Sequence, residues 1–177
     1  MIVSLKTALV ARGLGDKTIH YTPRYNAFWQ SGAGPPNANA FKTDGEGVDV
    51  VAYVDAHSEF GGDAIDYVHL MMYDIAATES FADAEEDFFV RAHYDAVVAA
   101  TLDYVPKAKI IMGFEPGPQA YTGVWGGLDH DKATIAHIRD RAGGCMFWAV
   151  NEQKVASNSK TVGENAVALA NYAAAAL

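Results

Sequence analysis

The sequence predicts an α/β fold in which parallel β-strands alternate with helices. Apolar segments with strand composition alternate with helical patterns along the chain. The expected strands begin near residues 18, 65, 109 and 145, at intervals of 36 to 47 residues. Each interval leaves room for the helix that a right-handed crossover between parallel strands requires. The length of 177 residues suits a single domain over residues 1–177, but it is short for a complete β/α barrel of about 250 residues.

Glycine and proline separate the elements of the first half. Gly13 follows the first helical pattern, and Pro23 ends the first extended segment. A loop rich in Gly, Pro and Asn then runs to about residue 47, and Gly61 with Gly62 closes the second helical pattern. The elements expected between these breaks are a helix over 1–12, a strand over 18–22, a helix over 48–60 and a strand over 65–73.

Helix boundaries carry further signals in the second half. Pro106 ends one helix because proline cannot continue it, and Asp129 is the expected N-cap of the next. Thr161 and Glu164 have the spacing of a capping box. The elements expected here are a helix over 85–105, a strand over 109–114, a helix over 129–141, a strand over 145–150 and an alanine-rich helix from 161 onward.

The strand over 65–73 presents two chemically different sides. Alternate residues of a strand point to opposite faces of the sheet. One side is aliphatic or thioether and suits packing against helices; it carries Val68, Leu70 and Met72. The other side is large and partly polar; it carries Tyr67, His69, Met71 and Tyr73. Because a flat, doubly wound sheet is more often aliphatic on both faces, the pattern favours the inside of a partial barrel of the TIM type.

Composition excludes several classes of partner. The chain has 13 Lys and Arg against 22 Asp and Glu, a net charge of −9, which makes it a poor ligand for nucleic acid or an anionic membrane. No apolar run is long enough to cross a bilayer. Cys145 is the only cysteine, so a multi-cysteine metal site is excluded. Asp55, His57 and Glu59 are split between helix faces by their spacing, and neither a metal nor a cofactor is expected.

Aromatic and carboxylate residues gather after the expected strands. Functional groups of parallel β/α folds lie at the carboxyl ends of the strands. The aromatic candidates there are Tyr25, Trp29, Tyr73, Trp125 and Trp148, and the carboxylates are Asp74 and Glu115. Sugar rings pack on aromatic faces while their hydroxyls need directional partners, so this edge suits a carbohydrate. The alternative is that the aromatic residues only seal the loop side of the core.

Three segments, in order, resemble glycoside hydrolase family 18, the chitinases and related proteins. Residues 65–74, IDYVHLMMYD, look like the sixth barrel strand of the family with its Met-x-Tyr-Asp ending. Residues 109–114 followed by a Pro/Gly loop look like the seventh, and residues 143–150, GGCMFWAV, look like the eighth with its late tryptophan. Residues 19–23 fit the fifth strand. The chain therefore resembles the C-terminal half of such a barrel, strands five to eight.

The resemblance implies a substrate-assisted glycosidase acting on β-1,4-linked N-acetylglucosamine glycans such as chitin. In that family the substrate's N-acetyl oxygen attacks the anomeric carbon, an exception to the usual two-carboxylate scheme. By the family pattern Tyr73 would hydrogen-bond the acetamido group, and Asp74 would contact the same sugar. Trp148 would form the floor under the sugar, and Met71 would pack below it.

The sequence departs from the family at its catalytic acid. The acid belongs to an Asp-x-x-Asp-x-Asp-x-Glu signature at the end of the fourth strand, and this chain has no such pattern. Asp63 and Asp66 match only its first half, with Val68 and Leu70 in the next two required places. Glu115 stands where the family usually has small residues, and a raised pKa would let it donate a proton.

Three functional hypotheses follow. The first is a family-18-type hydrolase portion that acts when the missing N-terminal half barrel is supplied elsewhere. The second is a non-catalytic, lectin-like sugar-binding protein on the same scaffold. The third is a stand-alone α/β protein that uses Asp74 and Glu115 on an unrelated small molecule. The first two predict a homo-oligomer or a complex with the missing half, because four barrel strands leave two open edges.

Overall fold

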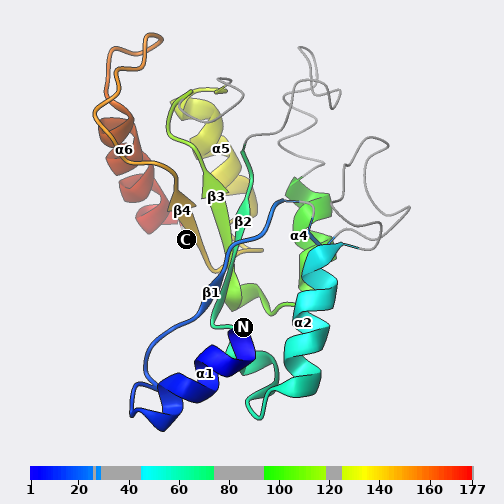
Figure 1. Cartoon of the computed structure of the whole chain (residues 1–177). Coiled ribbons are helices and arrows are strands. Elements are labelled where there is room, and N and C mark those ends of the chain that lie inside the picture. Colours follow the sequence, from blue (N-terminus) through cyan, green and yellow to red (C-terminus); the bar gives the residue numbers. More distant parts are fainter. Residues whose placement is uncertain (26, 29–44, 74–93, 119–124, 177) are drawn as a thin grey trace.

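The computed structural model describes residues 1–25, 27, 28, 45–73, 94–118 and 125–176. These residues form an α/β structure with one four-stranded sheet, drawn in Figure 1. All three neighbouring strand pairs are parallel, and the strands follow the chain order β1-β2-β3-β4. The predicted alternation of helices and parallel strands is confirmed over the described part of the chain.

The strands are shorter than their apolar patterns. Their bounds are His20–Tyr21 for β1, Tyr67–Met71 for β2, Ile110–Phe114 for β3 and Gly144–Phe147 for β4. Strand β4 therefore ends before the expected residue 150, although the Trp148 amide still donates to the Phe114 carbonyl at 2.9 Å. All four predicted strands are present, and only their ends differ.

The described helices match the predicted ones in order. Their bounds are Ile2–Ala11 for α1, Glu46–His57 for α2, Tyr94–Leu102 for α4, Leu128–Ile138 for α5 and Val162–Ala176 for α6. Short 3₁₀ turns cover Gly61–Ala64 and Lys107–Lys109. The helix predicted over 85–105 lies partly outside the described residues.

Several predicted helix boundaries were wrong, and α4 and α5 end at Leu102 and Ile138, each three residues before the expected end. Gly127, with φ of 97°, occupies the N-cap position of α5, and Asp129 lies inside its first turn. A carboxylate there still favours the helix because it faces the positive end of the helix dipole. Helix α2 ends at His57, since Ser58 is extended and its Oγ accepts a hydrogen bond from the Phe60 amide. The glycines at 61 and 62 belong to the 3₁₀ turn that follows.

The predicted capping box is confirmed at the start of α6. The Glu164 amide donates to Thr161 Oγ1 at 3.1 Å, and the Thr161 amide donates to Glu164 Oε2 at 2.6 Å. The second of these bonds, from the Thr161 amide to the ionised carboxylate, is the main cause that lowers the pKa of Glu164. Two amide donors that the helix cannot satisfy internally are thus satisfied by side chains.

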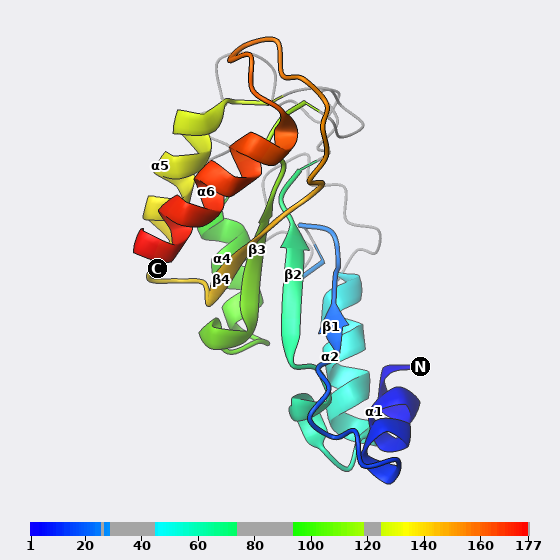
Figure 2. The same cartoon turned by 90° about the vertical axis from the view of Figure 1, so that its left-hand side faces the viewer.

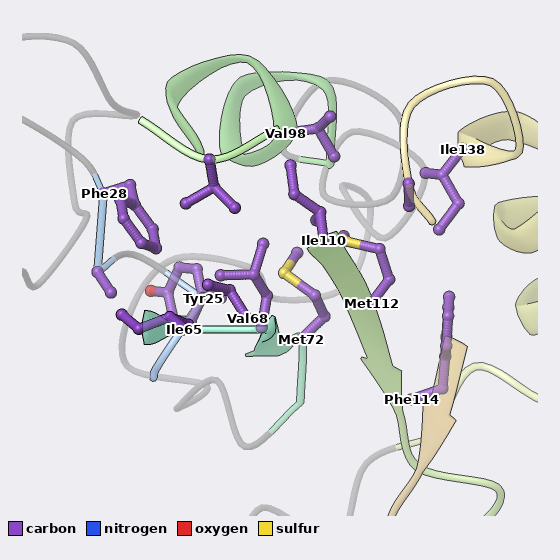
Figure 3. Close-up of a cluster of buried hydrophobic side chains, with 14 of the residues drawn as sticks. Tyr25, Phe28, Ile65, Val68, Met72, Val98, Ile110, Met112, Phe114 and Ile138 are labelled. Atoms are coloured by element: carbon purple, nitrogen blue, oxygen red, sulfur yellow. The ribbon is translucent and has the colours of Figure 1, made fainter. Parts of the chain in front are cut away.

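One face of the sheet forms the hydrophobic core with the helices. Figure 3 shows Val68, Met72, Ile110 and Met112 in the cluster, with Val98 of α4 on the helical side. The described helices α2, α5 and α6 contribute further buried residues to the same cluster: Val54, Ile135, Ile138, Leu169 and Ala173. The aliphatic side of the 65–73 segment therefore packs on helices, as predicted.

The opposite face, which we call the open face, carries the partly polar residues. Register places His20 beside Tyr67, His69 beside Ile111, and Met71 beside Gly113, which neighbours Met146. The side chains of this face in β2, β3 and β4 are half-buried, whereas their neighbours on the helical face of β2 and β3 are almost fully buried. Figure 2 shows α4, α5 and α6 together on the left, with α1 at the lower right beyond the amino ends of the strands.

Charged side chains make hydrogen bonds and ion pairs at the amino ends of the strands. Lys6 of α1 is buried and pairs with Asp66 at 3.3 Å, and the Ile19 amide donates to the same carboxylate oxygen at 2.7 Å. Lys109 donates to the Ile65 carbonyl at 3.0 Å and pairs with Asp63 at 2.9 Å. These contacts hold α1 and the 3₁₀ turn away from the carboxyl ends of the strands. No helix in the described part of the chain has both the length and the apolar character needed to cross a membrane.

Candidate functional site at the carboxyl ends of the strands

Two aromatic rings from non-adjacent strands meet at the carboxyl edge of the sheet. Tyr73 follows β2, and Trp148 follows β4 directly. Their ring centroids are 5.7 Å apart, and the ring planes are inclined by only 11°. Trp148 remains 44% exposed, while Tyr73 is half-buried. The Trp148–Ala149 peptide bond is cis. The pair forms a partly exposed aromatic surface where parallel β/α folds carry their function.

The stack depends on a missing side chain in the strand between its members. Strand β3 lies between β2 and β4, and its Gly113 pairs with Met71 on one side and Met146 on the other. A Cβ at Gly113 would lie 2.7 Å from the Met146 methyl carbon and 3.2 Å from Tyr73 Cε1. It would also lie 2.7 Å from the Leu70 carbonyl oxygen. Only glycine therefore leaves room for Tyr73 to lean across β3 toward Trp148.

Gly113→Ala is expected to destabilise the fold by about 1–3 kcal/mol, the usual cost of overpacking a closely packed site. The Leu70 carbonyl belongs to the backbone and cannot move aside without disturbing β2. Urea unfolding measures the change. Gly62→Ala is the matched control, since its Cβ would meet only Asp55 Oδ1 at 4.0 Å. Equal stability of the two variants would contradict the close packing over β3.

Glu115 is placed inside the protein at this edge. It directly follows β3 and is 8% exposed. In the sheet, β3 lies between β2, which Tyr73 follows, and β4, which Trp148 follows. Glu115 is therefore not a solvent-exposed loop residue. It belongs to the packed interior at the carboxyl end of β3.

The other predicted site residues fall in different places. Met71 is half-buried on the open face, with Arg24 beside it in a parallel bridge. Tyr25 is 7% exposed and belongs to the helix-side core, where Figure 3 labels it near Ile65 and Val68. The structure therefore does not bring Tyr25 to the Tyr73–Trp148 pair. Asp74 and Trp29 lie outside the described residues.

Trp125 is tied to helix α5. Its indole Nε1 donates to Asp131 Oδ2 at 2.8 Å, and Asp131 is 6% exposed in the first turn of α5. The ring of Trp125 is itself half-buried. A buried carboxylate that accepts a hydrogen bond from an indole N–H fixes one edge of the ring. Helix α5 therefore sets the position of the Trp125 ring.

Burial shifts the pKa of two titratable groups of the sheet, His69 and Cys145, toward their neutral forms. The rings of His20 and His69 are 4.8 Å apart, and burial together with the charge of His20 lowers the pKa of His69. Burial raises the pKa of Cys145 to about 12, which keeps the thiol protonated and unreactive. Among the described residues, no group of three or more His, Cys, Asp or Glu could hold a metal ion.

Two residues of the site region escaped the sequence reasoning. Asn165 is fully buried in α6, and the alanine-rich pattern around it did not lead us to predict a buried polar residue there. Its spacing from Val162 and Leu169 puts it on the buried face of the helix, and this signal was available. Gly113 was also missed, because a single glycine inside a strand does not reveal which ring would use its space.

No protein-family model, curated protein or solved structure matches this chain.

Proposed function

We propose that this chain binds β-1,4-linked N-acetylglucosamine glycans at the Tyr73–Trp148 edge, as the C-terminal half of a chitinase-like family 18 barrel. The observation that supports the proposal is the stacked pair at the carboxyl ends of β2 and β4, with 44% of Trp148 exposed. A sugar ring presents C–H groups that pack on such a flat surface. The chain contributes a sugar-binding floor in this proposal.

The sheet supports the architectural part of the proposal. Four parallel strands in chain order, with the buried residues of the described helices gathered on one face, are what half of a TIM-type barrel contains. The open face would then line the barrel interior. In this arrangement Met71 lies below the sugar, Trp148 forms the floor and the Tyr73 hydroxyl donates to the acetamido oxygen.

Binding and hydrolysis are separated in the proposal. The family's acid signature is absent from the sequence, so protonation of the leaving oxygen needs an acid on another segment or chain. This chain alone acts as a lectin-like module. Glu115 is the one described carboxylate that directly follows β3, and its burial favours a structural position over contact with a leaving group.

Calorimetry with chitin oligosaccharides tests the proposal. We expect saturable heat of binding to the wild-type chain, with no release of reducing ends on long incubation. Cello-oligosaccharides, which lack the acetamido group, serve as the control ligand and should bind more weakly because Tyr73 then has no partner. Absence of binding at millimolar sugar would overturn the proposal.

Release of reducing ends would instead show that the chain holds its own acid. In that event Glu115→Gln tests whether Glu115 is that acid: loss of the release with binding intact would assign the role to it, since glutamine keeps the shape and cannot donate as an acid. The same variant distinguishes the third hypothesis, a stand-alone α/β protein. The third hypothesis would be favoured if the chain binds no chitin, acts on a non-carbohydrate substrate, and loses that activity in Glu115→Gln.

A further inference from the structure

Asn165 is a buried polar residue with partners in two different loops. It is 0% exposed in the first turns of α6. Its Nδ2 donates to the Pro116 carbonyl at 3.0 Å, and its Oδ1 accepts from Asn158 Nδ2 at 3.0 Å. Both ends of the amide are therefore used in a direction-specific way.

The two loops reached by Asn165 are those that carry Glu115 and Trp148. Pro116 directly follows Glu115 at the carboxyl end of β3. Asn158 belongs to the connection from Trp148 to α6, which also bonds to that helix through its backbone. In those bonds the Val162 amide donates to the Gln153 carbonyl at 2.9 Å, and the Gly163 amide donates to the Asn151 carbonyl at 2.8 Å.

Attachment of α6 to the protein does not require this amide. Leu169 and Ala173 bury the same face of the helix in the core cluster, and α6 packs on α5 and β4. A buried amide is costly unless its hydrogen bonds are made, whereas an aliphatic side chain carries no such cost. The two loops are already joined at their starts by the bond from the Trp148 amide to the Phe114 carbonyl, and the Asn165 amide adds a second, side-chain connection further along them.

We propose that Asn165 is a positioning residue that joins these two loops and so sets the place of Trp148 relative to Glu115 at the carboxyl edge. This inference rests on the proposed sugar-binding function for its consequence, but its structural part stands on the two hydrogen bonds. Aspartate at 165 keeps the acceptor for Asn158 and loses the donor to Pro116. It also places a carboxylate oxygen against the Pro116 carbonyl oxygen.

Two measurements on Asn165→Asp test the inference. The first is the affinity for chitin oligosaccharide at a temperature where the variant is folded, and we expect a decrease of about tenfold. The second needs no ligand: the indole N–H resonance of Trp148, assigned by its loss in Trp148→Phe, should shift in Asn165→Asp. Asn158→Ala, at a half-buried loop position, should move both quantities in the same direction.

Leu169→Ala is the matched control, because it removes buried contacts of the same helix without touching either loop bond. It should lower stability and leave the affinity and the Trp148 resonance unchanged. Wild-type values for both quantities in Asn165→Asp, or equal shifts in Leu169→Ala, would overturn the inference. If Asn165→Asp does not fold, Asn158→Ala decides by the same criteria. A wild-type chain that binds no chitin refutes the sugar proposal alone, and the Trp148 resonance still decides the positioning role.

Discussion

Trp148→Ala is expected to reduce the affinity for chitin oligosaccharides by about 30-fold or more. Truncating a central tryptophan of a binding site usually costs about 2 kcal/mol or more. Trp148 supplies the exposed member of the stack with Tyr73, at a centroid distance of 5.7 Å. Titration calorimetry on folded protein measures the change. Stability should fall little, because 44% of the residue is already exposed.

Tyr53→Ala is the matched control for this prediction. Tyr53 is also a large exposed aromatic residue, at 57%, and it also stacks on a ring, that of His57 at 4.0 Å. It lies on α2, away from the carboxyl edge of β4. Its removal should leave affinity unchanged, and Trp148→Phe should retain part of it. Equal losses in Trp148→Ala and Tyr53→Ala would mean that the sugar does not sit on the predicted surface.

The elements of the fold could be predicted where the deciding interactions lie within a single helix or strand. The Thr161–Glu164 capping box needs only residues three apart, and it forms as the sequence predicts. The two sides of β2 also follow from local alternation. Asp129 failed as an N-cap because Gly127, two residues earlier, adopts the positive φ that starts the helix there. Competing local choices of similar energy are decided by the tertiary structure.

The sequence predicts which strand ends form the site, but not which of their side chains are in contact. The edge that carries Tyr73 and Trp148 follows from parallel topology, but their contact depends on the space over Gly113. Tyr25 shows the converse, since an aromatic residue after a strand has the same sequence signal whether it lines a rim or fills the core. The 7% exposure of Tyr25 assigns it to the core, and no local pattern distinguishes the two outcomes.

Self-association is the second large effect expected of this chain. Strands β1 and β4 form the edges of the four-stranded sheet, and parallel sheets are normally covered on both faces. The open face includes Tyr67, Ile111 and Met146, all half-buried. An exposed edge together with such a face favours pairing with another chain. Sedimentation equilibrium should therefore give a mass well above the 19.0 kDa of one chain.

Met146→Lys should shift the sedimentation equilibrium toward the monomer, because it places a charge on the open face while the lysine stem preserves much of the packing over Gly113. Val167→Lys is the control, since Val167 is 59% exposed on α6 and outside the open face. A wild-type chain that sediments as a stable 19.0 kDa monomer at every concentration would contradict the half-barrel arrangement. Association that both variants weaken equally would place the contact elsewhere. Loss of association in Met146→Lys alone would assign the contact to the open face, the face that a complete barrel would enclose. The associating chain would then complete the edge at which we propose that sugar binds.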